Sequence, residues 1–254
     1  YESIIWKSNH SLGANGFDVN YLNPIIFFRP VEYSINSPDN AIIGLDLKYN
    51  LTLKSNIYAQ LILDEFTLKE IKANNGYWAN KYGYQIGFKY YDLLNITNLT
   101  LHLERNHARP YTYSHWNNAN YGHYNEELAH PLGANFSENI FILHYRKDRL
   151  EIQFKYLDII YGADYLGDTI SYGNNIYSDY NNRSSDFGID MFNGNKTNID
   201  YMQLNLSYIL NPSTNLKIDL SLSSRNLSSE IYDYNTLFYS IALKSDLFNH
   251  YYDF

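Results

Sequence analysis

Residues that could perform chemistry are concentrated in one polar and aromatic stretch, which runs from Arg109 to Phe136: RPYTYSHWNNANYGHYNEELAHPLGANF. It contains three histidines, His115, His123 and His130, together with four tyrosines, one tryptophan and five asparagines. Imidazole nitrogens bind metals or move protons, whereas aromatic rings beside amides suit the binding of sugars. The stretch is therefore a candidate metal site, active site or carbohydrate-binding surface.

The spacing of the histidines does not favour a metal site. The three in the stretch are eight and seven residues apart, whereas zinc sites combine close pairs, about three to five residues apart, with a ligand elsewhere. His102 and His107 are five apart, but an odd spacing on a strand puts two side chains on opposite faces. We therefore expect no metal and no other cofactor, and the simplest interpretation is hydrogen bonding within a folded loop.

The carbohydrate interpretation depends on the mixture of residue types. A pyranose ring has apolar CH faces and many hydroxyls, so its site needs flat aromatic rings as well as hydrogen-bonding groups. Amides and an acid that could serve as polar contacts are Asn117, Asn120, Asn125 and Glu126. The candidate glycan-binding residues are Tyr111, Tyr113, His115, Trp116, Tyr121, His123 and Tyr124.

A pair of neighbouring acids, Asp64 and Glu65, does not predict acid–base catalysis. Adjacent residues on a strand point to opposite faces, so the two carboxylates cannot act on one bond. We expect Asp64 to pair instead with a base such as Lys89 or Arg105.

The sequence also does not support either of two known kinds of outer-membrane enzyme. His10 and Ser11 are the residue types of an outer-membrane phospholipase, but adjacent residues in an extended segment point apart. Omptin-type proteases use acidic and Asp–His pairs, and no motif singles such a pair out here. We therefore expect a protein that is not an enzyme.

The composition narrows the class of protein. The chain has 254 residues, a net charge of -8, no cysteine and 28 tyrosines. Without cysteine there is neither a disulfide framework nor a thiolate site, and the acidic balance argues against nucleic acid as a partner. Tyrosine has an apolar ring and a polar tip, and it therefore suits interfaces between lipid and water.

Alternation of apolar and polar residues is the strongest pattern along the chain. In YMQLNLSYIL, Met202, Leu204, Leu206 and Tyr208 alternate with polar residues, and a turn at NPST leads to a second alternating segment. Such a period of two predicts strands with one apolar face. It recurs at residues 43–49, 57–63, 84–90, 99–103, 150–156, 216–222 and 237–243.

Strand length and loop asymmetry favour a membrane barrel over a soluble sandwich. The strands are about ten residues long, which is what a tilted strand needs to cross a bilayer. Short turns alternate with long polar loops at about 109–137 and 163–197. We therefore predict an all-β chain, a transmembrane antiparallel outer-membrane β-barrel with about ten strands. Residues 1–254 would form a single barrel domain, expected to be the C-terminal part of a longer chain and a larger barrel.

In a membrane barrel, one face of each strand contacts lipid and the other faces the lumen. We expect the apolar residues of the hairpin at 202–222 to face lipid and the polar ones to face the lumen. The lipid-facing set is Leu204, Leu206, Leu216, Ile218 and Leu220, and the lumenal set is Gln203, Asn205, Lys217 and Asp219.

Several segments resemble one known family. FDVNYLNPIIFFRPVEYS, GYWANKYGYQIGFKYYD, the ERNHARPYTYSHWNNANYGHYNEELAHPLGANF block and the terminal LFNHYYDF are together similar to RemB-like gliding-motility proteins of Bacteroidota. These proteins are grouped with Wzi-like capsule-assembly proteins of the outer membrane.

The resemblance implies a function and a location. It implies a non-enzymatic barrel in the cell outer membrane that handles or retains surface polysaccharide and is linked to gliding and adhesion. The expected partners are outer-membrane lipid, capsular or exopolysaccharide and other outer-membrane proteins. The alternative is an accessory barrel subunit of a multi-protein outer-membrane complex for assembly, secretion or uptake.

Overall fold

One antiparallel sheet of ten strands dominates the computed structural model, which describes residues 1–6, 18–22, 39–115 and 119–245. The strand order is β1-β2-β3-β4-β5-β8-β9-β10-β11-β12, so neighbours in the chain are neighbours in the sheet. This confirms the predicted all-β class and the number of strands. The bounds are β1 Glu2–Ile5, β2 Asn40–Thr52, β3 Ser55–Glu65, β4 Lys81–Tyr90, β5 Leu99–Ala108, β8 Phe136–Lys147, β9 Leu150–Ala163, β10 Asn195–Asn211, β11 Leu216–Ser229 and β12 Asp233–Ser245.

The remaining elements are short. They are the 3-10 turns η2 Val19–Leu22, η3 Leu93–Asn95 and η4 Tyr180–Asn182, the helix α2 Leu68–Ala73, and the small pair β6 Gly122–His123 and β7 Glu126–Glu127. Among the described residues, no helix has the length and apolarity to cross a bilayer.

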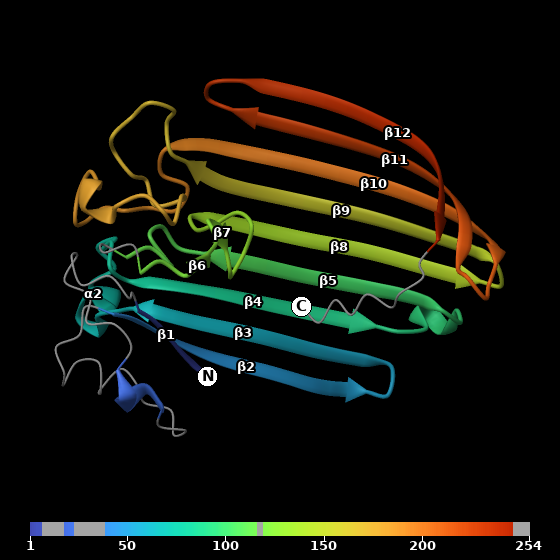
Figure 1. Cartoon of the computed structure of the whole chain (residues 1–254), viewed down its shortest axis with the longest axis horizontal. Helices are drawn as coiled ribbons and strands as arrows, with labels where there is room; N and C mark the ends of the chain where they lie inside the picture. Colours follow the sequence, from blue (N-terminus) through green and yellow to red (C-terminus); the bar gives the residue numbers. More distant parts are fainter. Residues whose placement is uncertain (7–17, 23–38, 116–118, 246–254) are drawn as a thin grey trace.

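The two ends of the strands differ, as Figure 1 shows: long connections gather at the left end and short turns lie at the right. The long connections include residues 109–135, between β5 and β8, and 164–194, between β9 and β10. Three of the short turns each hold a residue with positive φ: Asn98 (63°), Asp148 (53°) and Asn215 (49°). Asn and Asp tolerate this conformation better than other residues with a side chain, which explains the tight turns at these positions.

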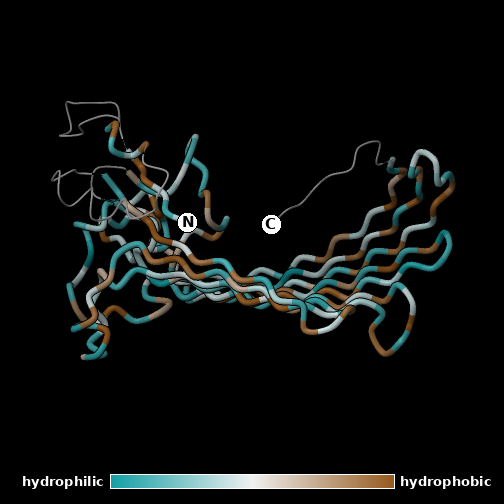
Figure 2. Tube along the Cα trace, turned by 90° about the horizontal axis from the view of Figure 1, so that it is seen from below, coloured by the Kyte–Doolittle hydropathy of each residue, from teal (hydrophilic) through white to brown (hydrophobic). Residues whose placement is uncertain are grey.

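One face of the sheet is apolar across its width. The register places Phe154, Leu204, Leu222 and Tyr239 side by side on β9 to β12. The neighbouring row on the same face carries leucines that remain uncovered, with Leu206 37 % and Leu220 43 % exposed. Figure 2 shows the alternation of hydrophobic and hydrophilic positions along the twisted strands. The predicted separation of faces is confirmed, and no second layer of described residues covers the leucines.

A polar row ends the apolar face on the side of the long connections. It crosses β5, β8, β9 and β10 as Arg105, Asn139, Asp158 and Asp200. Arg105 Nη1 donates to Asn139 Oδ1 (2.8 Å), and Asn139 Nδ2 donates to Asp158 Oδ2 (2.9 Å). Toward the short turns, the same face carries the tyrosines Tyr49, Tyr90, Tyr145 and Tyr208.

The opposite face is polar and cross-linked between strands. His144 Nε2 lies 2.8 Å from Glu151 Oε1, and Lys217 Nζ lies 3.5 Å from Glu151 Oε2. Asp219 accepts from Ser207 Oγ at 2.6 Å and pairs with Lys244. These contacts join β8 to β12 on the face that the sequence predicts to be lumenal.

The sheet is open within the described residues. Its order begins with β1 and ends with β12, and these two strands are not paired with each other. β1 pairs only with Asn40 to Ile43, so β2 from Leu45 onward has no strand partner on that side in this part of the chain. The structure thus has the predicted strands but not a closed ring.

The long connections pack into a cap over one end of the polar face. Its core consists of Ile42, Ala108, Tyr113, Ala134, Phe136 and Ile176. Asn135 is fully buried, and its Nδ2 donates to the carbonyls of Gly162 (2.9 Å), Tyr172 (3.2 Å) and Asn193 (2.9 Å). The cap is therefore a folded layer held by hydrogen bonds as well as by apolar contact.

Candidate ligand-binding pocket on the polar face

Three of the seven candidate glycan-binding residues are buried in the cap. Tyr111, Tyr113 and His115 are 1 %, 6 % and 8 % exposed. Tyr111 Oη donates to the carbonyl of Ser171 (2.8 Å), and the amide of Tyr113 donates to Asp64 Oδ2 (2.9 Å). Their rings serve packing rather than stacking on a sugar, which corrects the expectation for these positions.

The other candidates have different positions. Tyr121 is partly exposed and packs 6.0 Å from Tyr113, whereas His123 and Tyr124 are exposed on the β6–β7 hairpin. Trp116 lies outside the described residues. The glycan role of Tyr121, His123 and Tyr124 remains a prediction.

Asp64 also differs from its expected environment. It lies at the cap end of β3, whereas Lys89 lies near the short turn, where it pairs in register with Asn56. Arg105 points to the opposite face and contacts Asn139. The predicted pairing of Asp64 with either base is therefore wrong, and its carboxylate anchors the start of the cap instead.

A pocket of about 630 Å³ lies beneath the cap, against the polar face of β2 to β5. Its floor comes from strand residues, and its opposite wall comes from Tyr1, Tyr121 and the segment 128–130. The volume is within the range of small-ligand sites, roughly 300–1,000 Å³. The stretch that begins at Arg109 thus contributes to a pocket, with most of the polar groups supplied by the sheet.

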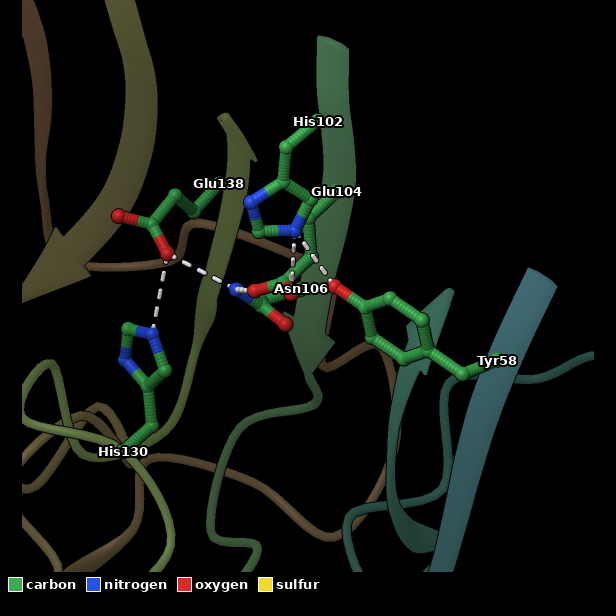
Figure 3. A network of polar contacts seen from close by, with 6 residues as sticks. All are labelled: Tyr58, His102, Glu104, Asn106, His130 and Glu138. Carbon is green, nitrogen blue, oxygen red and sulfur yellow. Dashed lines mark hydrogen bonds and ion pairs between the residues drawn. The ribbon is translucent and has the colours of Figure 1, made fainter. Parts of the chain in front are cut away.

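A hydrogen-bonded network lies beside this pocket and joins three strands to the cap (Figure 3). Tyr58 donates to Glu104, and His102 Nε2 lies 2.6 Å from the Tyr58 hydroxyl. Asn106 Nδ2 bridges the two acids, at 2.8 Å from Glu104 Oε1 and 3.0 Å from Glu138 Oε2. Both carboxylates are therefore fixed in position.

His130 connects the cap to this network. Its Nδ1 accepts from the amide of Leu132 (3.2 Å), so Nε2 carries the proton and donates to Glu138 Oε2 at 3.0 Å. Its ring also stacks on Phe136 at 4.4 Å. These contacts fix the position of His130, and with it the pocket wall at residues 128–130, relative to the sheet.

A glycine explains how Tyr58 reaches across the sheet. The ring lies over Gly87 on β4, where any β-carbon would overlap it. Because Gly87 leaves this space, the hydroxyl reaches His102 and Glu104 on β5, two strands away. A residue with a side chain at position 87 would displace Tyr58 and open the network.

Several polar groups at the pocket are not used by the protein itself. Asp46, Gln60 and Gln85 form one cross-strand row on the polar face. None of the three makes a side-chain hydrogen bond or ion pair to another described residue. Asn56 also lines the pocket, and its Oδ1 is buried and has no hydrogen-bond partner among the described residues. These groups are suited to a hydrated ligand with many hydroxyls.

Burial in the cap keeps its tyrosines neutral. Desolvation raises the pKa of Tyr111 to about 12. Desolvation, together with the charge of Asp64, raises the pKa of Tyr113 well above its usual range. Both hydroxyls therefore remain protonated at neutral pH, and that of Tyr111 donates to the carbonyl of Ser171.

Within the described ranges, no group of three His, Cys, Asp or Glu side chains is arranged to hold a metal ion. His102 and His107 lie on opposite faces as predicted, with His107 stacked 4.8 Å from Tyr84. The arrangement as a whole offers hydrogen bonds, aromatic edges and two lysines, Lys48 and Lys89.

The sequence did not single out Tyr58, Gln60, Lys89 or Glu104 as site residues. Each occupies a polar position of an alternating strand, and that pattern alone predicts only which face it lies on. The register of four strands was needed to show that they meet at one pocket.

No family model, no curated protein and no solved structure matches the chain.

Proposed function

We propose that the chain forms part of the wall of an outer-membrane β-barrel. The observation that carries the proposal is the apolar face, which bears exposed large hydrophobic side chains on β2 to β5 and on β9 to β12 and is backed by a polar face. On β12 the exposure is largest, with Ile241 79 % exposed. In water such a surface would promote association, whereas in a bilayer it is solvated by lipid.

The height of the apolar face supports this proposal. On β10 it runs from Met202 to Leu210, between Asp200 of the polar row and the turn. Eight steps of about 3.3 Å give a length of about 26 Å along the strand. Strands of an outer-membrane barrel tilt by about 35–45°, so this run spans about 20 Å of an apolar band about 25 Å tall, which aromatic residues border. The tyrosines near the turns fit such a border.

Closure of the barrel needs strands in addition to those described. Unpaired backbone groups are costly in lipid, so the outer sides of β2 and β12 require partners. All pairings in the sheet are antiparallel. β1 and β12 therefore run in opposite directions, so added antiparallel strands between them must be even in number. Further strands of a longer chain would meet this requirement.

The function that we propose for this barrel is non-enzymatic handling or retention of surface polysaccharide, linked to gliding and adhesion as in RemB-like and Wzi-like proteins. The pocket beneath the cap supports it, because the cross-strand row of Asp46, Gln60 and Gln85 is free to bind hydroxyls. Tyr121, at the pocket wall, provides a partly exposed ring.

One observation favours a second candidate, an accessory subunit of an outer-membrane complex. The open outer side of β12 could pair with a strand of another protein as well as with the same chain. A partner that co-purifies in equal amount from detergent, and protects β12 from hydrogen exchange, would support this candidate.

The experiment compares cells with and without the protein. We expect its loss to move surface polysaccharide from the cell-associated fraction into the medium, and the restored gene to reverse the change. The protein itself should fractionate with the outer membrane. Unchanged polysaccharide distribution would contradict the proposed retention, and recovery of the protein in a soluble fraction would contradict the barrel.

A further inference from the structure

Two lysines flank Tyr58 at the pocket. Lys48 on β2 lies opposite Tyr58 in the register, and Lys89 Nζ on β4 lies 5.4 Å from the centre of the Tyr58 ring. Both line the pocket. Neither forms an ion pair with any residue of the part of the chain that the structure describes.

Among the described residues, no acid near the pocket forms an ion pair with either lysine, because the two glutamates face other partners. Glu104 accepts from Tyr58 and Asn106, and Glu138 accepts from Asn106 and His130. Asp46 lies on the same face of β2, two residues from Lys48, and it remains at the pocket as a hydrogen-bond acceptor.

A buried acceptor next to one lysine is an independent observation. Asn56 pairs in register with Lys89, is 9 % exposed, and its Oδ1 has no hydrogen-bond partner within the described ranges. A buried polar atom without a partner costs free energy. A ligand hydroxyl that donates to Asn56 Oδ1 would remove this cost.

We propose that the pocket binds an acidic sugar unit, whose carboxylate lies between Lys48 and Lys89 and whose hydroxyls contact Asn56, Gln60 and Gln85. The inference rests on the proposed retention of polysaccharide and specifies its class as one that contains uronic acids. A neutral glycan would leave both lysines without a direct ion-pair partner. Ammonium groups paired with a carboxylate in a partly enclosed site make strong, charge-assisted hydrogen bonds.

The test measures binding of tetragalacturonate to the full chain in detergent by calorimetry, beside its carboxyl-reduced counterpart. We expect the acidic probe to bind and the reduced probe to bind at least tenfold more weakly. The double variant Lys48→Gln, Lys89→Gln should lose at least tenfold in affinity for the acidic probe and change little for the reduced one. Lys155→Gln removes the same charge from the polar face of β9, outside the pocket, and should bind as the parent does.

Three outcomes would overturn the acidic-sugar site. They are equal binding of both probes, an unchanged affinity of the double variant, and an equal loss in Lys155→Gln, which would indicate only a general charge effect. Displacement of the probe by inorganic phosphate at equal concentration would also overturn it, because the site would then be a phosphate site. If cells lose polysaccharide without the protein but retain it with the double variant, this inference fails while the proposed function stands.

Discussion

The side chain of Asn135 makes four hydrogen bonds to backbone groups inside the cap. The residue lies in the left-handed region (φ 55°), and its Oδ1 accepts from the amide of Phe192 at 2.7 Å while Nδ2 donates to three carbonyls. One amide of the β5–β8 connection therefore satisfies backbone groups of β9 and of the β9–β10 connection, which are distant in sequence. An aspartate could not donate these bonds, and an alanine would leave all four groups unpaired.

Asn135→Ala should lower the free energy of unfolding by about 2–4 kcal/mol, because buried carbonyls lose their donors and alanine disfavours a positive φ. Urea unfolding followed by tryptophan fluorescence measures this change, since Trp78 packs in the cap. Asn125→Ala is the matched control, because Asn125 has a similar φ (63°) but is exposed. Equal effects of the two substitutions would contradict the role of the buried amide.

The carboxyl of Asp164, just after β9, should make the stability of the folded protein depend on pH. Desolvation raises the pKa of this carboxyl, although hydrogen bonds from the amide of Tyr172 (2.7 Å) and from Ser178 Oγ (3.2 Å) oppose the shift. A folded-state pKa above the unfolded value means that the folded state binds the proton more tightly. The corresponding stability is present below the unfolded pKa and is lost as pH rises through the folded pKa.

Asp164→Asn should therefore be more stable than the parent at neutral pH and no more stable at a pH below the unfolded pKa. Urea midpoints measured at several pH values test this, with Asp148→Asn, at an exposed position in the β8–β9 turn, as the control. A parent and variant whose stabilities stay parallel across the whole pH range would show that burial of Asp164 has no such consequence.

At the scale of the strand, one substitution distinguishes the two faces. Leu206 and Gln203 lie on the same strand, β10, but on opposite faces. Leu206→Lys should destabilise the inserted protein by about 2–4 kcal/mol, because a charge near the middle of the apolar band loses its hydration. Gln203→Lys should cost much less. Folding into vesicles, followed by the electrophoretic shift of folded barrels, measures both, and an equal effect would argue against a lipid-facing leucine.

Strands were predictable because alternation is local: Met202 to Leu210 shows its apolar face without knowledge of any neighbour. The short turns were predictable as well, since Asn98, Asp148 and Asn215 favour the conformation that those turns need. The site was not. Tyr58, Asn106 and His130 meet only because of the register of the sheet and the fold of the cap, and both are set by contacts between residues distant in sequence.

Burial within the cap could not be predicted from residue type either. Tyr111 and Tyr113 have the residue type of a sugar-binding platform, and their type does not reveal that they are buried. Lys81 is a stronger example, because it is 0 % exposed, donates to the carbonyl of Ser114 (3.0 Å) and lies 4.4 Å from the ring of Tyr180. A lysine is expected at the surface unless its partners are known.

For the whole molecule, we propose that this curved sheet is a wall between lipid and an aqueous interior. Because the chain has no cysteine, single cysteines can be introduced at each position from 202 to 210 on β10 and spin-labelled without further changes. Collision of the label with oxygen, which partitions into lipid, is compared with collision with a water-soluble nickel chelate in membrane-inserted protein. We expect strict alternation, with labels at 202, 204, 206, 208 and 210 favouring oxygen and those between them favouring nickel. Equal access of nickel to both sets would contradict a membrane wall.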